Sequence, residues 1–179
     1  MDLVLCRFHK GQLGWHYEMQ GAVTYAYPEN WKKKLTDAAM LDAETLLIMH
    51  REYGSFIGER VLDFLADQGL KADLVASHGH TIFHQPWKQF TFQLGSGASV
   101  AASCGMDTVS DFRTLDVALG GQGAPLVPVG DELLFSHYGF CLNLGGFANI
   151  SNRLNQVRIA CDICPVNIVA NQLAQVNGQ

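Results

Sequence analysis

The sequence predicts an α/β fold, and two observations carry this prediction. Short apolar segments that are typical of buried strands alternate with segments in which apolar residues recur every three or four positions, as in helices. An antiparallel strand pair is expected to precede this alternation. The chain has 179 residues, of which 48% are hydrophobic, and this composition is typical of a globular protein rather than a disordered one.

The first expected element is a hairpin. Asp2–Phe8 reads as a short apolar strand, and a returning strand ends before Pro28. The turn between them is expected at His9–Gln12, where Gly11 can take a positive φ.

A long helix is expected next. Asp42 is a favourable N-cap, the helical pattern runs to Gln68, and Gly69 suits the position just after a helix. Gly54 and Gly58 lie four residues apart and allow another helix to approach closely. The apolar stripe that should face the core consists of Leu46, Met49, Tyr53, Phe56, Ile57, Val61, Phe64 and Leu65.

The remaining elements follow the α/β alternation. Leu74–Ser77 reads as a buried strand that runs into a loop with three histidines. Residues 91–106 contain a strand end, a glycine turn and a small-residue helix. The other expected elements are a strand in 107–113, a short helix in 132–135, two strands joined by glycines in 140–151, a strand in 155–162 and a helix that starts at 167.

Charge and composition exclude several functional classes. The net charge is −5 and no basic stripe appears, which argues against a nucleic-acid partner. No segment has the length and apolarity of a membrane span or the pattern of a signal peptide, so we expect a cytoplasmic protein without a membrane partner. The five cysteines are odd in number and scattered, which does not suggest a secreted disulfide framework.

Polar residues gather where strands are expected to end. In open α/β sheets ligands bind beyond the carboxyl ends of the strands, so these positions predict a cleft. They are His78, His80, Thr81, His84, Asp111, Arg113, Asn143, Gly145, Gly146, Asn149 and Asp162.

A zinc or thiol site is the less favoured interpretation of part of this set. The candidate ligands are His78, His80, His84 and the pair Cys161 and Cys164. The histidine segment contains no carboxylate to orient the rings, and a structural zinc site would need a second cysteine pair at matching spacing. We therefore expect no metal site made by the protein alone, histidines that bond backbone or substrate, and cysteines that fill apolar space.

Two glycine-rich stretches and one aspartate remain open on the residues alone. The stretch GGQGAPL lacks the Lys-Ser/Thr ending of a Walker loop, and Pro125 stands where a dinucleotide fingerprint needs glycine. The stretch NLGGFAN fits an anion-binding turn and a plain hairpin turn equally well. Asp162 fits a general base at the end of a strand and an N-cap of the following helix equally well.

Five motifs occur in a characteristic order: SHGHTIFHQP, FQLG, SDFRTLDVALGGQGAPLVP, LNLGGFANIS and CDICPVN. Together they resemble the anhydro-N-acetylmuramic acid kinases of bacterial peptidoglycan recycling, essentially from end to end. The resemblance implies an actin-like sugar-kinase fold with two ribonuclease-H-like lobes, each a mixed sheet with flanking helices, around an ATP cleft. It also implies a kinase that opens 1,6-anhydro-N-acetylmuramic acid with water and forms N-acetylmuramic acid 6-phosphate.

The resemblance implies a role for each matching residue. Asp162 matches the catalytic aspartate, which takes a proton from the attacking water. Arg113, His78 and Thr81 match residues on the sugar side. Asn143, Gly145, Gly146 and Asn149 match the second phosphate-binding turn, which holds ATP with its Mg²⁺.

The sequence departs from the family pattern at two places. The usual Asp-Thr-Gly-Pro-Gly-Asn turn is replaced by DICPVN, which lacks both glycines. The chain also lacks the family's first phosphate-binding strand and most of its second lobe. Residues 1–139 are therefore expected to be an incomplete first lobe and 140–179 the start of a second.

Two expectations follow from this incompleteness. A catalytically incomplete remnant with a sugar half-site is the alternative to an active kinase, and the chain alone is expected to lack activity. The exposed apolar surface and unpaired strand edges of such a chain favour a homodimer, formed by strand exchange, or marginal stability.

Overall fold

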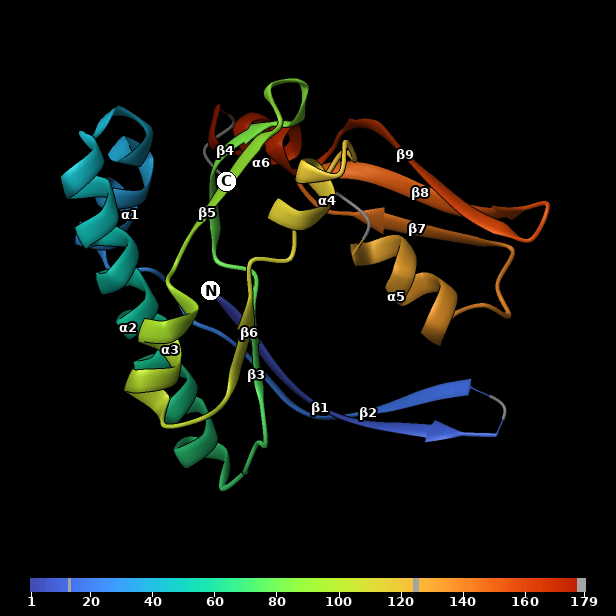
Figure 1. The fold of residues 1–179 in the computed structure, drawn as a ribbon, viewed down its shortest axis with the longest axis horizontal. Helices are drawn as coiled ribbons and strands as arrows, with labels where there is room; N and C mark the ends of the chain where they lie inside the picture. The colour runs from blue at the N-terminus through green and yellow to red at the C-terminus, as the bar shows by residue number, and fades with distance from the viewer. Residues whose placement is uncertain (13, 124–125, 177–179) are drawn as a thin grey trace. The chain divides into compact units, whose positions relative to one another are not determined.

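The computed structural model describes residues 1–12, 14–123 and 126–176, in which helices and strands are mixed along the chain (Figure 1). This mixture confirms the predicted α/β class. The chain forms two compact units: unit 1 comprises Met1–Arg7 and Glu18–Ala124, and unit 2 comprises Phe8–Tyr17 and Pro125–Gln179. The lobe boundary after residue 139 stays a prediction. Within the described residues, no helix has both the length and the apolarity needed to cross a bilayer.

The N-terminal hairpin is confirmed, but its turn lies later than expected. Strand β1 (Asp2–Gly11) pairs with β2 (Gly14–Thr24) in a two-stranded sheet. The turn predicted at His9–Gln12 is wrong, because the first three of these residues continue β1. Pairing extends the strand beyond its apolar part, and the positive φ, 125°, occurs at Gly14 and not at Gly11.

Helix α2 (Ala43–Gln68) has both of its predicted ends. The Asp42 carboxylate accepts a hydrogen bond from the Thr45 amide at 3.0 Å, and Gly69 takes the left-handed conformation with φ 63°. The shorter helices α1 (Glu29–Asp37) and η1 (Ala38–Met40) precede it. Its predicted stripe forms the core of unit 1: Met49, Tyr53, Ile57, Val61 and Phe64 are buried, and Leu46, Phe56 and Leu65 are partly buried.

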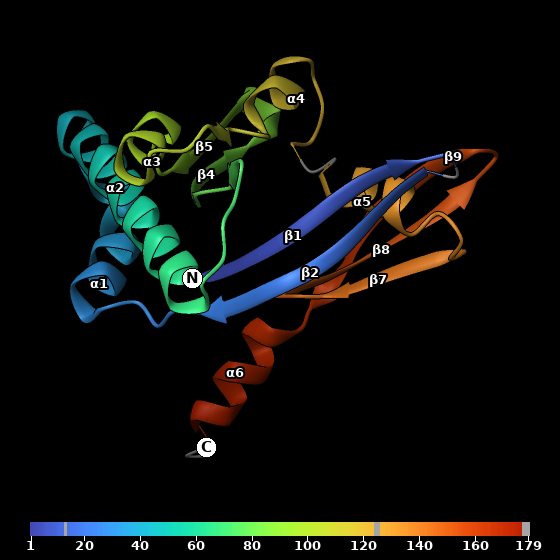
Figure 2. The same cartoon turned by 90° about the horizontal axis from the view of Figure 1, so that it is seen from below.

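Helix α3 (Gly97–Cys104) packs alongside α2 (Figures 1 and 2). Their contact needs glycine on α2. A Cβ at Gly54 would lie 2.5 Å from the Ser96 carbonyl oxygen, and one at Gly58 would lie 2.6 Å from Ser103 Cβ. The predicted close helix contact at these glycines is therefore confirmed.

Two short parallel strands position the polar residues His78 and Asp111. Strands β3 (Val75–Ser77) and β6 (Thr108–Ser110) pair in parallel, with Ser77 opposite Ser110. Since parallel strands end at the same edge of a sheet, the residues that follow them, His78 and Asp111, emerge side by side.

The predicted histidine loop is mostly a strand. Strand β4 (His80–Gln85) pairs antiparallel with β5 (Phe90–Leu94), and the short helix η2 (Pro86–Lys88) connects them. The loop was inferred from polar residue types, but hydrogen bonding to β5 satisfies the backbone of this segment whatever its side chains are. His80 and His84 therefore lie in β4, and only His78 lies in a loop.

The glycine-rich stretch is shorter than its composition suggests, because helices flank it. Helix α4 (Thr114–Ala118) precedes it, and α5 (Leu126–Leu134) follows it, so the helix predicted at 132–135 begins earlier. Asp116 Oδ2 accepts a hydrogen bond from the Gly123 amide at 2.6 Å. The Pro125 of the excluded dinucleotide fingerprint, and Ala124, lie outside the described residues.

Unit 2 contains a three-stranded antiparallel sheet, ordered β7 (Phe140–Leu144), β8 (Phe147–Leu154) and β9 (Val157–Pro165) (Figure 2). These strands and the following helix α6 (Asn167–Val176) confirm the predicted order of elements. A bulge interrupts the ladder: Asn149 lies opposite Asp162 and Ala148 opposite Cys164, so Ile163 is an extra residue.

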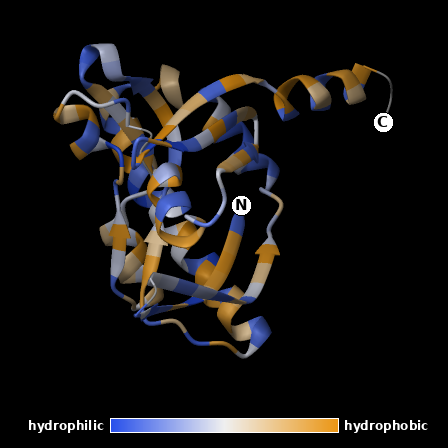
Figure 3. Ribbon diagram, turned by 90° about the vertical axis from the view of Figure 1, so that its right-hand side faces the viewer, coloured by the Kyte–Doolittle hydropathy of each residue, from blue (hydrophilic) through white to orange (hydrophobic). Residues whose placement is uncertain are grey.

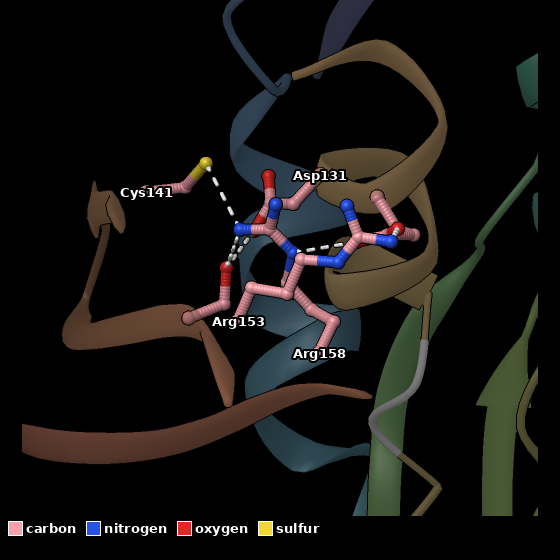
Figure 4. A network of polar contacts seen from close by, with 6 residues as sticks. Asp131, Cys141, Arg153 and Arg158 are labelled. Atoms are coloured by element: carbon pink, nitrogen blue, oxygen red, sulfur yellow. Dashed lines mark hydrogen bonds and ion pairs between the residues drawn. The ribbon is translucent and has the colours of Figure 1, made fainter. Parts of the chain in front are cut away.

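A buried ionic network joins α5 to one face of this sheet (Figure 4). The Arg158 side chain is only 4% exposed, and its Nε donates to Glu132 Oε2 at 3.2 Å. Ser151 donates to Asp131 of α5 and accepts from Arg158 Nη1. Glu132 also forms an ion pair of 2.9 Å with Arg153, which is more exposed than Arg158.

Replacing Glu132 by leucine is expected to destabilise unit 2. The change leaves the buried Arg158 guanidinium without its carboxylate, and because Glu132 itself is partly exposed we expect a loss of about 2 kcal/mol. Arg153→Leu removes only the more exposed partner and should cost less than about 1 kcal/mol. Amide hydrogen exchange of β8 and β9 measures both effects, and equal protection in the two variants would contradict this account of the network.

The opposite face of the sheet is apolar and exposed. Phe140, Leu142 and Leu144 of β7 are each more than half exposed, as are Leu154 of β8 and Val157 of β9. Apolar residues also recur along α6, where Figure 3 colours them orange. Unit 2 therefore presents a large apolar surface to its surroundings.

Candidate active site

A cavity of about 160 Å³ opens in unit 1 beyond the ends of β3 and β6. Its wall combines polar and apolar surface and comes from five elements or their ends. The lining residues are His50 of α2; Ser77 and His78 at the end of β3; Phe92, Gln93 and Gly95 at the end of β5; Gly97 of α3; and Ser110, Asp111 and Thr114 around the end of β6. Of the eleven polar residues that predicted a cleft, His78 and Asp111 line this cavity.

One of the predicted sugar-side residues, His78, lines this cavity, and a second, Arg113, contacts His78. Arg113 Nε donates a hydrogen bond of 2.9 Å to His78 Nε2, although the residues are 35 positions apart. Because Nε2 accepts this bond, the His78 proton resides on Nδ1, which lies 3.2 Å from the Gly79 carbonyl oxygen. Arg113 Nη1 also donates to the Gly123 carbonyl oxygen at 2.9 Å, so the guanidinium is held from two sides.

Asp111 is held in an unusual backbone conformation at the mouth of this site. Its φ is 58°, in the left-handed region that only a few non-glycine residues occupy. Its Oδ1 accepts a hydrogen bond of 2.6 Å from the Thr114 hydroxyl at the start of α4. The side-chain contact and the turn together fix a carboxylate at the cavity wall.

Burial lowers the pKa of two histidines near the cavity. Desolvation is the main cause for His50, and the nearby Asp111 carboxylate opposes it. Desolvation also lowers the pKa of His80, with a smaller contribution from His78. The rings of His50 and His80 are therefore neutral at pH 7, and they act as hydrogen-bonding groups and not as cations.

Thr81, the third predicted sugar-side residue, lies in β4 and does not line the cavity. It is exposed and lies opposite Gln93 of β5 in the ladder. The structure thus brings His78 and Arg113 into contact and leaves Thr81 one strand away.

Unit 2 brings most of the predicted phosphate and base residues into one row. Asn143, Asn149 and Asp162 face one another across β7, β8 and β9 and therefore share one side of the sheet. Gly145 and Gly146 form the turn after β7, and their carbonyl oxygens accept hydrogen bonds from the amides of Asn167 and Val166. The start of α6 thereby fixes the turn.

The predicted position of Asp162 at the end of its strand is wrong. Strand β9 continues to Pro165, because the bulge at Ile163 lets pairing with β8 resume after Asp162. The N-cap interpretation is also wrong, since α6 begins at Asn167, five residues later.

The described part of the chain gives the zinc interpretation no support. Among the residues that the structure describes, no three histidine, cysteine, aspartate or glutamate side chains are grouped so that they could hold a metal ion. Cys161 and Cys164 are both exposed, which contradicts the expectation that they fill apolar space.

Sequence reasoning missed most of the cavity residues, among them His50 and Gln93. His50 belongs to the predicted long helix and breaks its apolar stripe, which is a weak signal. Gln93 lies in the quoted motif FQLG, and strand β5 buries Thr91 and Gln93 while Phe90 on the opposite face is 44% exposed. Alternation in the sequence shows that the faces differ but not which one is buried.

Comparison with known proteins decides the family. The family profile described as "Anhydro-N-acetylmuramic acid kinase" matches residues 1–178. The chain belongs to the anhydro-N-acetylmuramic acid kinase family. Relatives with this name include one from Vibrio cholerae, 36% identical over 84% of this chain and 44% of the relative, and one from Pseudoalteromonas translucida, 30% identical over 98% of this chain and 49% of the relative.

A third member of the anhydro-N-acetylmuramic acid kinase family, from Pseudomonas putida, is 47% identical over 58% of this chain and 30% of its own length. The chain therefore spans less than half the length of these three relatives.

Proposed function

We propose that this chain carries two sets of active-site residues of an anhydro-N-acetylmuramic acid kinase. One set binds the sugar, and the other binds phosphate and supplies the general base. The reaction is the hydrolytic opening of 1,6-anhydro-N-acetylmuramic acid with transfer of the ATP γ-phosphoryl group, which gives N-acetylmuramic acid 6-phosphate. The contact of Arg113 with His78, which lines the cavity of unit 1, is the observation that carries the proposal. Family membership names the kinase class and thereby implies ATP.

Arg113 is the residue that binds the acidic part of the sugar. Muramic acid carries a lactyl carboxylate, and a guanidinium pairs with carboxylates through directed hydrogen bonds. Two of its nitrogens are fixed by His78 and Gly123, so the group is oriented before the substrate arrives. His78 and Thr81 supply further polar contacts to the sugar.

The Gly145–Gly146 turn binds phosphate together with two asparagines, Asn143 and Asn149. Backbone amides of a glycine turn approach phosphate oxygens closely, and asparagine side chains add donors. Asn143 Nδ2 lies 3.8 Å from the point that a Cβ on Gly145 would occupy, so an amide donor adjoins bare backbone. Mg²⁺ bound with ATP would neutralise phosphate charge, and the oxygens of Asp162 and the asparagines are of the type that Mg²⁺ prefers.

Asp162 is the general base. It accepts a proton from water as the water oxygen bonds to the anomeric carbon C1 and the bond between C1 and the bridging O6 breaks. The released O6 then bonds to the γ-phosphorus, the bond from that phosphorus to the bridging oxygen breaks, and ADP leaves. The Asp162 side chain is exposed, so water can reach the carboxylate that takes this proton.

Several broader features belong to the same proposal. They are the actin-like fold with two ribonuclease-H-like lobes, a lobe boundary after residue 139, a homodimer and a cytoplasmic location. The exposed apolar face of the unit 2 sheet supports an assembly that covers it. The turn DICPVN lacks the family's two glycines, so the chain's own contribution to phosphate binding rests on Gly145 and Gly146.

Calorimetric titration with 1,6-anhydro-N-acetylmuramic acid tests the proposal. The chain should bind the sugar, and Arg113→Met should weaken binding at least tenfold because a charge-assisted hydrogen bond is lost. Arg113→Lys should bind with intermediate affinity, and Arg51→Met, an exposed change on α2, should have no effect. Equal affinity in the wild type and Arg113→Met would overturn the sugar-binding role of Arg113.

A second titration, with ATP and Mg²⁺, distinguishes an active kinase from the alternative, a catalytically incomplete chain. If the nucleotide binds and its γ-phosphoryl group is transferred to the sugar, the chain is an active kinase. If the sugar binds and the nucleotide does not, the chain is a sugar half-site.

A further inference from the structure

The glycine-rich loop after α4 folds back onto the first turn of that helix and is held there by Asp116. The Asp116 carbonyl oxygen accepts a hydrogen bond of 2.8 Å from the Gly121 amide. Its side-chain Oδ2 accepts a second one, of 2.6 Å, from the Gly123 amide. Gly123 is buried and takes the left-handed conformation, with φ 68°. One residue of α4 therefore holds the loop at two points.

The fit of this loop against α4 leaves no room for side chains on two of its glycines. A Cβ at Gly121 would lie 2.5 Å from Asp116 Cγ. A Cβ at Gly123 would lie 2.8 Å from Val117 Cγ2. Both distances are shorter than real side-chain contacts allow, so the Asp116 carboxylate can reach the loop only because these positions are glycine.

The loop in turn holds Arg113. The Gly123 carbonyl oxygen accepts a hydrogen bond of 2.9 Å from Arg113 Nη1, while Arg113 Nε donates to His78 Nε2. Gly123 is thus a link whose amide bonds Asp116 and whose carbonyl oxygen bonds Arg113. These contacts use two of the five N–H groups of the guanidinium, and a carboxylate ligand needs only two of the other three.

The link matters because the loop has little conformational preference of its own. Glycine loses more backbone freedom on folding than any other residue, and this loop contains Gly120, Gly121 and Gly123. Its folded conformation therefore depends on contacts such as the one from Asp116. An arginine that is already oriented loses less side-chain entropy when a ligand binds, and this raises affinity without adding a contact to the ligand.

We propose that Asp116 is a positioning residue for the sugar: its carboxylate holds Gly123, whose carbonyl oxygen orients the Arg113 guanidinium toward the lactyl carboxylate. This inference rests on the proposed function for the identity of the ligand. The Asp116 carboxylate faces the Gly123 amide, so it acts through Arg113 and not by touching the substrate.

Titration of the 179-residue chain with two sugars tests the proposal. One is 1,6-anhydro-N-acetylmuramic acid, and the other is 1,6-anhydro-N-acetylglucosamine, which lacks the lactyl carboxylate. Asp116→Ala should weaken binding of the acidic sugar about fivefold and leave binding of the neutral sugar unchanged. Asp67→Ala removes the same charge from an exposed position of α2 and should bind both sugars like the wild type.

A double-mutant cycle separates positioning from a general structural role. If Asp116 acts through the guanidinium, Asp116→Ala should change affinity by less than about twofold when Arg113→Met is already present. Asp116→Asn should restore binding of the acidic sugar to within about twofold of the wild type, because its side-chain oxygen can still accept the Gly123 bond.

Gly121→Ala gives the same comparison without changing the aspartate, and it replaces Asp116→Ala if that variant does not fold. Its methyl group would occupy the place of the Asp116 carboxylate and displace it from the Gly123 amide. The acidic sugar alone should again bind about fivefold more weakly. Gly130→Ala on α5, where a Cβ meets open space, is the matched control and should have no effect.

Hydrogen exchange of the Arg113 Nε–H, followed by NMR in the ligand-free chain, tests the orientation directly. The proton donates to His78 in the wild type and should exchange faster with water in Asp116→Ala, because the guanidinium loses its second anchor at Gly123. Asp116→Asn should exchange like the wild type.

The outcomes separate this inference from the proposed function. If Asp116→Ala weakens both sugars equally, or still weakens binding beside Arg113→Met, Asp116 supports the fold only and the positioning role is overturned while sugar binding stands. If neither sugar binds, the sugar role of Arg113 fails, and the exchange measurement decides the inference alone. Faster exchange in Asp116→Ala then supports the positioning of Arg113 by Asp116, and equal exchange overturns it.

Discussion

Replacing Asp162 by asparagine is expected to abolish phosphoryl transfer while leaving the fold intact. Asparagine has the same shape and can occupy the same place in β9, but it cannot take a proton from water. General base catalysis contributes about 10²- to 10⁴-fold to the rate, so the loss should be of this order. The exposed position of Asp162, opposite Asn149 in the sheet, gives no reason for a loss of stability.

The measurement is turnover of 1,6-anhydro-N-acetylmuramic acid with ATP. Because the chain spans less than half of its relatives, the assay uses a fusion in which the remaining segments of the Vibrio cholerae relative complete it. Asp73→Asn, an exposed change in unit 1, is the control and should retain full activity. An active Asp162→Asn fusion would assign the base to another residue.

Replacing Gly54 by valine is expected to unfold much of unit 1. A Cβ at this position would lie 2.5 Å from the Ser96 carbonyl oxygen and 2.9 Å from Ser99 Cβ, and the first of these atoms is backbone that cannot rotate away. Helix α3 would have to move off α2, and we expect a loss of about 3 kcal/mol or more. Since Gly97 of α3 lines the cavity, sugar binding should weaken as well.

Urea unfolding followed by the fluorescence of Trp31, which is buried in unit 1, measures this effect. Glu59→Val places the same side chain on an exposed position of the same helix, so it reports the effect of a β-branched residue alone. That control should cost less than about 1 kcal/mol. Similar midpoints for the two variants would show that α2 and α3 are not in close contact at Gly54.

The sequence was sufficient to predict features that depend on local patterns. Helix α2 has a capping carboxylate at Asp42, a left-handed glycine at its end and an apolar stripe between them. Each of these signals acts within a few residues, and all agree with one another, so the helix and its buried face follow directly. The glycine pair at Gly54 and Gly58 likewise predicted a close contact, although not with which helix.

Features that depend on long-range pairing could not be predicted in the same way. The contact between His78 and Arg113 exists because β3 and β6 pair in parallel, and no local pattern specifies that pairing. The histidine segment forms a strand only because β5 returns alongside it. Gln93 lies at the cavity because β5 ends there, and the motif FQLG does not encode that position.

The extra residue at Ile163 has a consequence for how this segment can change in evolution. Deleting one residue from an ordinary strand turns every later side chain to the opposite face. Here the ladder already contains one surplus position, so loss of Ile163 would leave Asp162 opposite Asn149 and Cys164 opposite Ala148. Loss of one residue at this point would therefore restore a regular ladder without turning Asp162 or the start of α6 to the opposite face.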